Sequence, residues 1–87
     1  MFYAYILHSL SHPDQYYTGH TSDLRARLKM HNEGTTPHTA KYRPWEVECY
    51  FALKTEKLAR DFEAYLKSGS GRAFALKHFR RSDTSVH

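Results

Sequence analysis

Five residues of this 87-residue chain have side chains whose types suit chemistry on a phosphate ester: Tyr5, Tyr17, Arg27, His31 and Glu63. An arginine offers planar paired donors that match phosphate oxygens, and it stays charged in any protein setting. A glutamate can hold Mg²⁺ or Mn²⁺ through oxygen while the ion keeps waters of its own. Arg27 and His31 are four residues apart, so on a helix they share one face. They can act together with the other three only if the intervening elements fold back onto that face.

The two tyrosines are predicted to lie on a β-hairpin. Residues 2–7 and 15–19 are rich in aromatic and β-branched types, and residues 12–14, His-Pro-Asp, carry turn chemistry. Alternate side chains of a strand share a face. The odd-numbered residues of the first strand, Tyr5 among them, are therefore expected on one side of the sheet and the even-numbered residues on the other.

The middle of the chain predicts a helix, a loop and a third strand. Thr21 or Ser22 offers an N-cap for a helix over residues 23–32. Residues 33–44 contain one glycine and two prolines among polar types and are predicted to form a loop. Residues 45–53 alternate as a strand does. The residues expected to share one face of this strand are Trp45, Val47, Cys49, Phe51 and Leu53.

A second amphipathic helix is predicted to begin after Thr55, which can cap it, and to stop at residues 68–71, Ser-Gly-Ser-Gly. Glu63 is expected to border its apolar stripe instead of facing open solvent. Residues 72–81 predict a short third helix, and residues 82–87 a frayed tail. The stripe consists of Leu58, Phe62, Tyr65 and Leu66.

The composition is that of an ordinary globular domain, with 40% hydrophobic and 25% charged residues. At 87 residues there is room for one modest core. The order β-β-α-β-α, with a short C-terminal helix, predicts an α+β domain over residues 1–81 in which helices flank a three-stranded antiparallel sheet. Residues 82–87 would follow it as a flexible tail.

Charge and cysteine content limit the partners and the compartment. Thirteen Lys and Arg against nine Asp and Glu give a formal charge of +4, which favours an anionic partner such as nucleic acid. Cys49 is the only cysteine, so an intramolecular disulfide and a four-cysteine zinc site are excluded. No apolar run approaches the ~18 residues of a membrane span, and we expect a cytoplasmic protein without a membrane partner.

The seven histidines do not predict a structural zinc site. His8 and His12 are four residues apart, but Pro13 and the expected turn oppose a helix there. A basic rim for a phosphate backbone is a stronger prediction, with Tyr42 and Trp45 available for stacking on bases. The candidate nucleic-acid-binding residues of this rim are Lys41, Arg43, Arg72, Lys77, Arg80 and Arg81.

Two tripeptides on the hairpin, residues 3–5 (Tyr-Ala-Tyr) and 17–19 (Tyr-Thr-Gly), precede Arg27, His31 and Glu63 in the chain. This ordered set resembles the GIY-YIG nuclease superfamily, and most closely its small standalone bacterial members. The resemblance covers nearly the whole chain, about residues 2–79. Residues 65–72 also look like the segment that follows the metal-binding glutamate in the small bacterial proteins.

The resemblance implies a metal-dependent endonuclease that hydrolyses phosphodiester bonds in nucleic acid, with DNA favoured and RNA as the alternative, and with one Mg²⁺ or Mn²⁺ held by Glu63. Arg27 would stabilise the charge that develops on phosphorus. Tyr17 or Tyr5 would accept the proton of the attacking water or orient that water, with Tyr17 preferred. His31 would assist or act as an alternative base, because its unperturbed pKa, about 6.5, needs less tuning. Without an added DNA-binding domain, little sequence specificity is expected, and structured or single-stranded DNA would be tolerated.

Two other functions remain open. Many GIY-YIG nucleases carry a late asparagine in the active site, and this chain has no asparagine after Asn32. That departure favours a nucleic-acid-binding module that keeps the fold and cleaves weakly or not at all. A protein-interaction domain is the third alternative, and it would need neither the arginine nor the glutamate.

Overall fold

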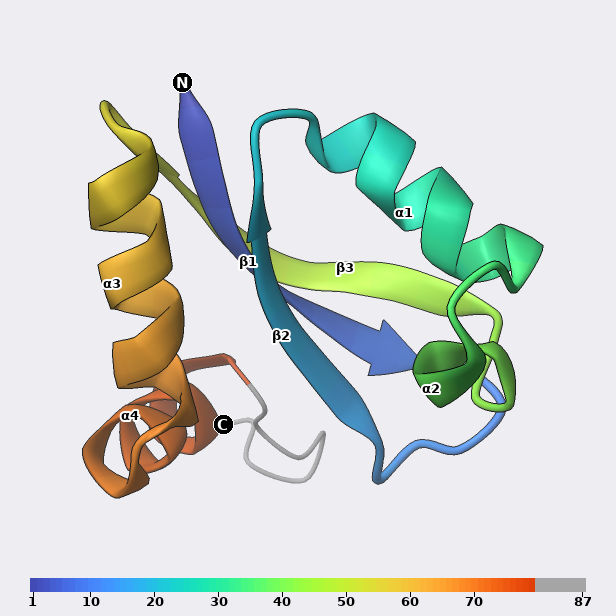
Figure 1. The fold of residues 1–87 in the computed structure, drawn as a ribbon. Helices are drawn as coiled ribbons and strands as arrows, with labels where there is room; N and C mark the ends of the chain where they lie inside the picture. Colours follow the sequence, from blue (N-terminus) through green and yellow to red (C-terminus); the bar gives the residue numbers. More distant parts are fainter. Residues whose placement is uncertain (80–87) are drawn as a thin grey trace.

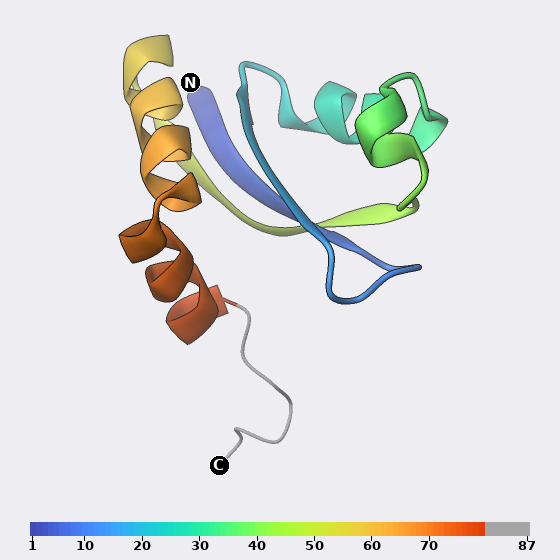
Figure 2. The same cartoon turned by 60° about the horizontal axis from the view of Figure 1, so that its bottom comes forward.

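The computed structural model describes residues 1–79 and confirms the predicted α+β class. The central strand of the antiparallel sheet is β1, between β2 and β3. Helices α1 and α2 lie on one side of the sheet, and α3 and α4 on the other (Figures 1 and 2). The elements in chain order are β1 (Phe2–Ser9), β2 (Tyr16–Thr21), α1 (Leu24–Glu33), α2 (Pro37–Ala40), β3 (Trp45–Leu53), α3 (Glu56–Lys67) and α4 (Gly69–Phe79).

The hairpin of β1 and β2 is confirmed, and both strands extend two residues beyond their predicted ends. Its register sets Tyr5 opposite Gly19. The even-numbered residues Ala4 and Ile6 belong to the core under α3 and α4, whereas Tyr5 and Leu7 belong to the core under α1. The alternation predicted for β1 is therefore correct.

The prediction that one face of β3 carries all five alternating residues is wrong, although the bounds of β3 are as predicted. Ile6 pairs with Cys49, but Leu7 pairs with Val47, so a bulge leaves Glu48 as an extra residue. Beyond the bulge the side chains change face. Trp45 and Val47 join the α1 core, and the others join the core under α3 and α4. The residues in the second group are Cys49, Phe51 and Leu53.

Helix α1 begins one residue later than predicted, because Asp23 is its N-cap instead of Thr21 or Ser22. The Asp23 carboxylate accepts a hydrogen bond from the Ala26 N–H at 3.0 Å. The helix ends at Glu33 and is capped by Gly34, whose φ of 78° is the left-handed conformation that glycine adopts without strain.

The predicted loop over residues 33–44 contains the short helix α2, which the sequence analysis missed. Pro37 occupies its first turn, where a missing N–H costs nothing. The Trp45 indole N–H donates to the Thr39 carbonyl at 3.0 Å, and Asn32 exchanges two hydrogen bonds with the Trp45 backbone. These bonds fix α2 against the end of α1.

On the other side of the sheet, Thr55 caps α3 as predicted. The predicted stripe is only half correct, since Leu58 and Tyr65 are 49% and 41% exposed. The buried surface of α3 instead runs through Ala59, Phe62 and Leu66. The buried face of α3 is therefore turned toward Ala59, by less than the ~100° that separates successive residues of a helix.

Residues 68–71 do not separate α3 from the next helix as predicted, because α4 begins at Gly69 instead of residue 72. The Ser68 hydroxyl accepts a hydrogen bond from the Gly71 N–H at 3.1 Å. A Cβ on Gly71 would lie 1.8 Å from the Tyr65 carbonyl oxygen, so this glycine allows α4 to pack directly on α3. Residues 80–81 of the predicted helix, and the tail predicted over 82–87, lie outside the described residues. Within residues 1–79, no helix has the length and apolar character needed to span a membrane.

Candidate active site

Tyr5 lies at the centre of the α1 side of the sheet and is fully buried. Its ring extends over Gly19 on the neighbouring strand. A Cβ on Gly19 would lie 2.7 Å from the Tyr5 hydroxyl oxygen and 3.2 Å from Cε2 of Tyr17. Gly19 therefore has a packing reason: only hydrogen at this position leaves room for both tyrosine rings.

His31, on the last turn of α1, is also buried, with 1% exposure. Its Nδ1 lies 2.9 Å from the Thr39 hydroxyl and its Nε2 lies 3.3 Å from the Tyr5 hydroxyl. The Thr39 hydroxyl donates to the Thr36 carbonyl at 3.4 Å, so it accepts from His31 Nδ1–H. Nε2 then accepts from Tyr5 O–H, which gives one continuous chain of donors from Tyr5 to Thr36.

The two titratable side chains of this network, Tyr5 and His31, are neutral near neutral pH. Burial raises the pKa of Tyr5 well above its usual range, the nearby Tyr17 adds to the rise, and Arg27 only partly opposes it. Burial also lowers the pKa of His31, and the positive charge of Arg27 lowers it further. A neutral phenol donating to a neutral imidazole is the arrangement that these shifts favour.

Tyr17 lies between this buried network and the surface. Its ring centroid is 4.8 Å from that of His31 and 6.3 Å from that of Tyr5. On the outer side it is 6.4 Å from the ring of His38. The structure therefore brings Tyr5, Tyr17 and His31 into one cluster, and Arg27 from α1 acts on two of its members.

Glu63 projects from α3, and its side chain is 17% exposed. His20 Nδ1–H donates to Glu63 Oε1 at 2.5 Å, and Lys67 Nζ donates to Oε2 at 2.6 Å. Burial alone would raise the pKa of this carboxyl, but the hydrogen bonds from Lys67 and His20 outweigh it and hold the pKa below its usual value. The carboxylate also contributes to the raised pKa of Tyr5, so its charge acts on the tyrosine cluster.

A groove of about 430 Å³ runs along the edge strand β2 beside Tyr17. Its cationic side chains are Lys67 and Arg72, and His38 lines it as well. We call it the β2 groove. The residues that line it are Asp14, Gln15, Tyr16, Tyr17, Thr18, His38, Leu66, Lys67 and Arg72.

The other basic residues predicted to contact nucleic acid are placed differently. Lys41 is exposed, with its ammonium 5.2 Å from the Tyr42 ring centroid, and lines a smaller pocket of about 100 Å³ that also contains Tyr17. Arg43 packs over Gly34, since a Cβ there would lie 1.7 Å from its guanidinium. Lys77 is exposed on α4. Arg80 and Arg81 lie outside the described residues.

Three residues of the site escaped the sequence analysis: His20, Thr39 and Lys67. His20 follows Gly19, so the period of two places it on the opposite face of β2, where α3 packs. Lys67 is four residues after Glu63, which on a helix makes them neighbours. Both could have been found from spacing. Thr39 lies in the unpredicted helix α2 and had no such signal.

A comparison with protein-family models supplies the deciding observation: the model described as the GIY-YIG catalytic domain matches residues 1–77. This chain belongs to the GIY-YIG family. The comparison with curated proteins gives no match. The GIY-YIG catalytic domain is a nuclease domain, so the chain is an enzyme of the phosphodiester-hydrolysing class with nucleic acid as its substrate.

GIY-YIG nucleases generally use a divalent metal, and the donor set can be tested against that requirement. A hard cation such as Mg²⁺ takes oxygen ligands and keeps several waters, so one ionised carboxylate suffices from the protein. The lowered pKa of Glu63 keeps its carboxylate ionised. Lys67 occupies one of its oxygens, but the lysine is 52% exposed and can swing into solvent. Glu63 therefore fits the role of a metal ligand.

Proposed function

We propose that this GIY-YIG domain is a DNA endonuclease that tolerates structured or single-stranded substrates and has little sequence specificity. One observation carries the proposal. Of the two motif tyrosines, Tyr17 lines the cationic β2 groove, whereas Tyr5 is fully buried behind it. A phosphate backbone attracted to Lys67 and Arg72 would pass directly over the Tyr17 ring.

In the proposed reaction the oxygen of a water attacks phosphorus, the bond from phosphorus to the leaving oxygen breaks, and the water proton passes to a base. Tyr17 accepts this proton in its phenolate form or, as the neutral phenol, orients the water, and the leaving oxygen takes up a proton from solvent. Tyr5 and His31 act behind it by fixing its ring through packing. Arg27 stabilises the charge that develops on the phosphate oxygens.

A single Mg²⁺ or Mn²⁺ held by Glu63 would supply positive charge near phosphorus and lower the pKa of a bound water when present. His20 is a positioning residue for that carboxylate, because its Nδ1–H holds Oε1 while leaving Oε2 to Lys67 or to the cation. Lys67 would leave the carboxylate as the cation arrives and would then be free to contact phosphate in the groove.

The rival function is a nucleic-acid-binding module with the same fold. Two observations favour it: no asparagine follows Asn32 in the sequence, and both oxygens of Glu63 already have partners in the protein. In that case Glu63 would organise His20 and Lys67 and would bind no ion.

We also propose that the chain acts as a standalone nuclease, as the small bacterial members of the family do. The proposal rests on the likeness of residues 65–72 to the corresponding segment of those proteins.

The test is the substitution Glu63→Gln, which keeps the shape of the side chain and removes the charge that a hard cation needs. Wild type and variant are incubated with labelled single-stranded, duplex and branched DNA, and with matching RNA, with and without Mg²⁺ or Mn²⁺. We expect metal-dependent cleavage of DNA by wild type and a loss of at least ~100-fold in the variant. Glu56→Gln, on the exposed first turn of the same helix, is the control for charge alone and should cleave normally.

Stability separates a metal ligand from a structural residue. The amide oxygen of a glutamine can still accept the hydrogen bond from His20, and the lost pair with half-exposed Lys67 is of the i,i+4 type, so Glu63→Gln should cost no more than about 1 kcal/mol. Cleavage by a folded Glu63→Gln protein at the wild-type rate would refute the metal assignment. DNA binding without cleavage by wild type, on every substrate, would establish the binding module instead.

A further inference from the structure

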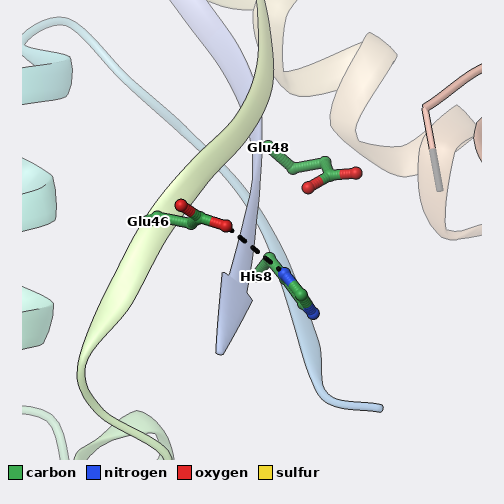
Figure 3. Close-up of side chains that lie close together, drawn as sticks. All are labelled: His8, Glu46 and Glu48. Atoms are coloured by element: carbon green, nitrogen blue, oxygen red, sulfur yellow. Dashed lines mark ion pairs between the residues drawn. The ribbon is translucent and has the colours of Figure 1, made fainter. Parts of the chain in front are cut away.

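Three potential metal-ligating side chains gather on the α3 and α4 side of the sheet, away from Glu63. They are His8 on β1 and Glu46 and Glu48 on β3 (Figure 3). One ligand atom from each lies within 4.8 Å of the others. His8 lies four residues along β1 from Ala4, the partner of His20, so this cluster is separate from the candidate active site.

The sheet register brings the cluster together. His8 pairs directly with Glu46 across β1 and β3. Glu46 and Glu48 flank Val47, which packs on the opposite face with Leu7. The bulge at Glu48 keeps its carboxylate on the side of His8, and Figure 3 shows all three side chains projecting to that side.

His8 is held with one particular nitrogen toward the carboxylates. Its Nε2–H donates to the Pro13 carbonyl at 2.8 Å, because a carbonyl can only accept. Its ring stacks on Tyr16 with centroids 4.7 Å apart and planes inclined by 17°. In the neutral ring the lone pair is therefore on Nδ1, which lies 3.5 Å from Glu46 Oε2. An imidazole that donates its other N–H to a backbone carbonyl is the arrangement found in metal-ligating histidines.

When the His8 ring is neutral, the cluster has two negative charges and no positive one, and a cation would stabilise it; a protonated His8 would instead pair with Glu46. Two carboxylates and an imidazole lone pair converge, and like charges at such distances repel. Among residues 1–79, no lysine or arginine forms an ion pair with Glu46 or Glu48. A divalent ion at the centre would offset both negative charges and accept the lone pair.

The distance between His8 and Glu46 fits a transition metal. Two ligands at about 2.0–2.1 Å from a tetrahedral ion are roughly 3.3 Å apart, close to the 3.5 Å between His8 Nδ1 and Glu46 Oε2. The Glu46 side chain is 52% exposed, so it can rotate to close the wider separations. The nitrogen ligand favours Zn²⁺ over Mg²⁺ or Ca²⁺, which prefer oxygen.

We propose that His8, Glu46 and Glu48 form a Zn²⁺ site that bridges β1 and β3, with a water completing the coordination. This site does not depend on the proposed nuclease activity, because it shares no residue with the candidate active site. Because the ligands come together only when the two strands are paired, Zn²⁺ binding should increase the free energy of unfolding.

The test is a calorimetric titration with Zn²⁺ in a Glu63→Gln background, which removes the active-site carboxylate from the measurement. We expect one ion per chain, an affinity at least ~10-fold weaker in Glu48→Gln, and a further loss when Glu46→Gln is added. Glu56→Gln serves as the matched control, since it removes one carboxylate from an exposed helix turn, and should bind as its parent does. Melting temperatures without metal check that each variant is folded.

A second readout uses the folded state itself. Saturating Zn²⁺ should raise the melting temperature of the parent and of Glu56→Gln, and should leave that of the double variant unchanged. Equal Zn²⁺ affinity in Glu48→Gln and Glu56→Gln would overturn the proposal, as would the absence of saturable binding in the parent. A negative result in the Zn²⁺ titration would not bear on the proposed nuclease activity. A negative result in the nuclease assay would likewise not bear on the Zn²⁺ site.

Discussion

Replacing Gly19 by alanine tests the packing of the tyrosine cluster directly. The new Cβ would lie 2.7 Å from the Tyr5 hydroxyl oxygen and 2.9 Å from Tyr5 Cζ. Tyr5 is fully buried and bonded to His31, so it cannot simply rotate away. Overpacking of this kind costs about 1–3 kcal/mol. The φ angle of Gly19 is not positive, so alanine also stabilises by about 0.4–1 kcal/mol through the unfolded chain.

The overpacking exceeds the gain, and we expect a net loss of about 1–2 kcal/mol, measured by urea or thermal unfolding. For a domain of this size that lowers the melting temperature by about 5–15 °C. Cleavage should fall more than tenfold at a temperature where the variant is folded, because small displacements of catalytic groups are costly.

A matched glycine provides the control for this experiment. Among residues 1–79, and apart from its chain neighbours and the backbone of its own helix, no heavy atom lies within 4 Å of a Cβ built on Gly69. Gly69→Ala should therefore leave stability unchanged or raise it by up to about 1 kcal/mol. The cost of Gly19→Ala should also shrink in a Tyr5→Phe background, where the hydroxyl that collides is gone. If Gly19→Ala proves as stable as Gly69→Ala, the account of the cluster is wrong.

Three further predictions concern this cluster and Glu63. Tyr17→Phe should reduce cleavage more than Tyr5→Phe, because Tyr17 lines the β2 groove and Tyr5 is buried; equal activity of both variants and wild type would leave the tyrosines with a structural role. Stability should fall as pH drops below about 6.5, since the lowered pKa of His31 means that the unfolded chain binds more protons there. Melting temperatures at pH 7.5 and 5.5 should therefore differ less in His31→Gln than in wild type, and an unchanged difference would contradict the assignment. Below pH ~4.5 the stabilisation from Glu63, whose pKa is also lowered, should be lost in turn.

The sequence predicted those features of the fold that depend on a few neighbouring residues. The bounds of β3 and the Thr55 cap of α3 agree with the structure, because side-chain alternation and capping depend on a few neighbouring residues. The face of β3 was predicted wrongly because the bulge at Glu48 arises from its register with β1. Register depends on two strands distant in sequence, and no pattern within one of them reveals it.

In the candidate site, too, some features could be predicted from the sequence and others required the tertiary structure. Tyr5, Tyr17, Arg27 and His31 were predicted from the family resemblance, and the structure clusters their side chains. That His31 is buried, and bonded to Tyr5 and Thr39 instead of facing a groove, required tertiary structure. Tyr5 and His31 are buried, whereas Tyr17 is partly exposed. This difference supports the preference for Tyr17 as the group nearest the substrate.

The partners of Glu63 bear on both candidate functions. In the protein alone, His20 and Lys67 balance the charge of a side chain that is 17% exposed, so the carboxylate is ionised before any cation arrives. An arriving divalent ion would therefore displace no proton from the carboxylate. It would take the place of the exposed Lys67 ammonium, so only the i,i+4 pair with Lys67, worth about 0.3–0.5 kcal/mol, is lost. That loss is small beside the affinity of a divalent ion for a carboxylate and phosphate together. The lysine released in this exchange lines the β2 groove. Engagement of both oxygens is thus compatible with a metal-dependent nuclease, and the missing late asparagine carries most of the case for the binding module.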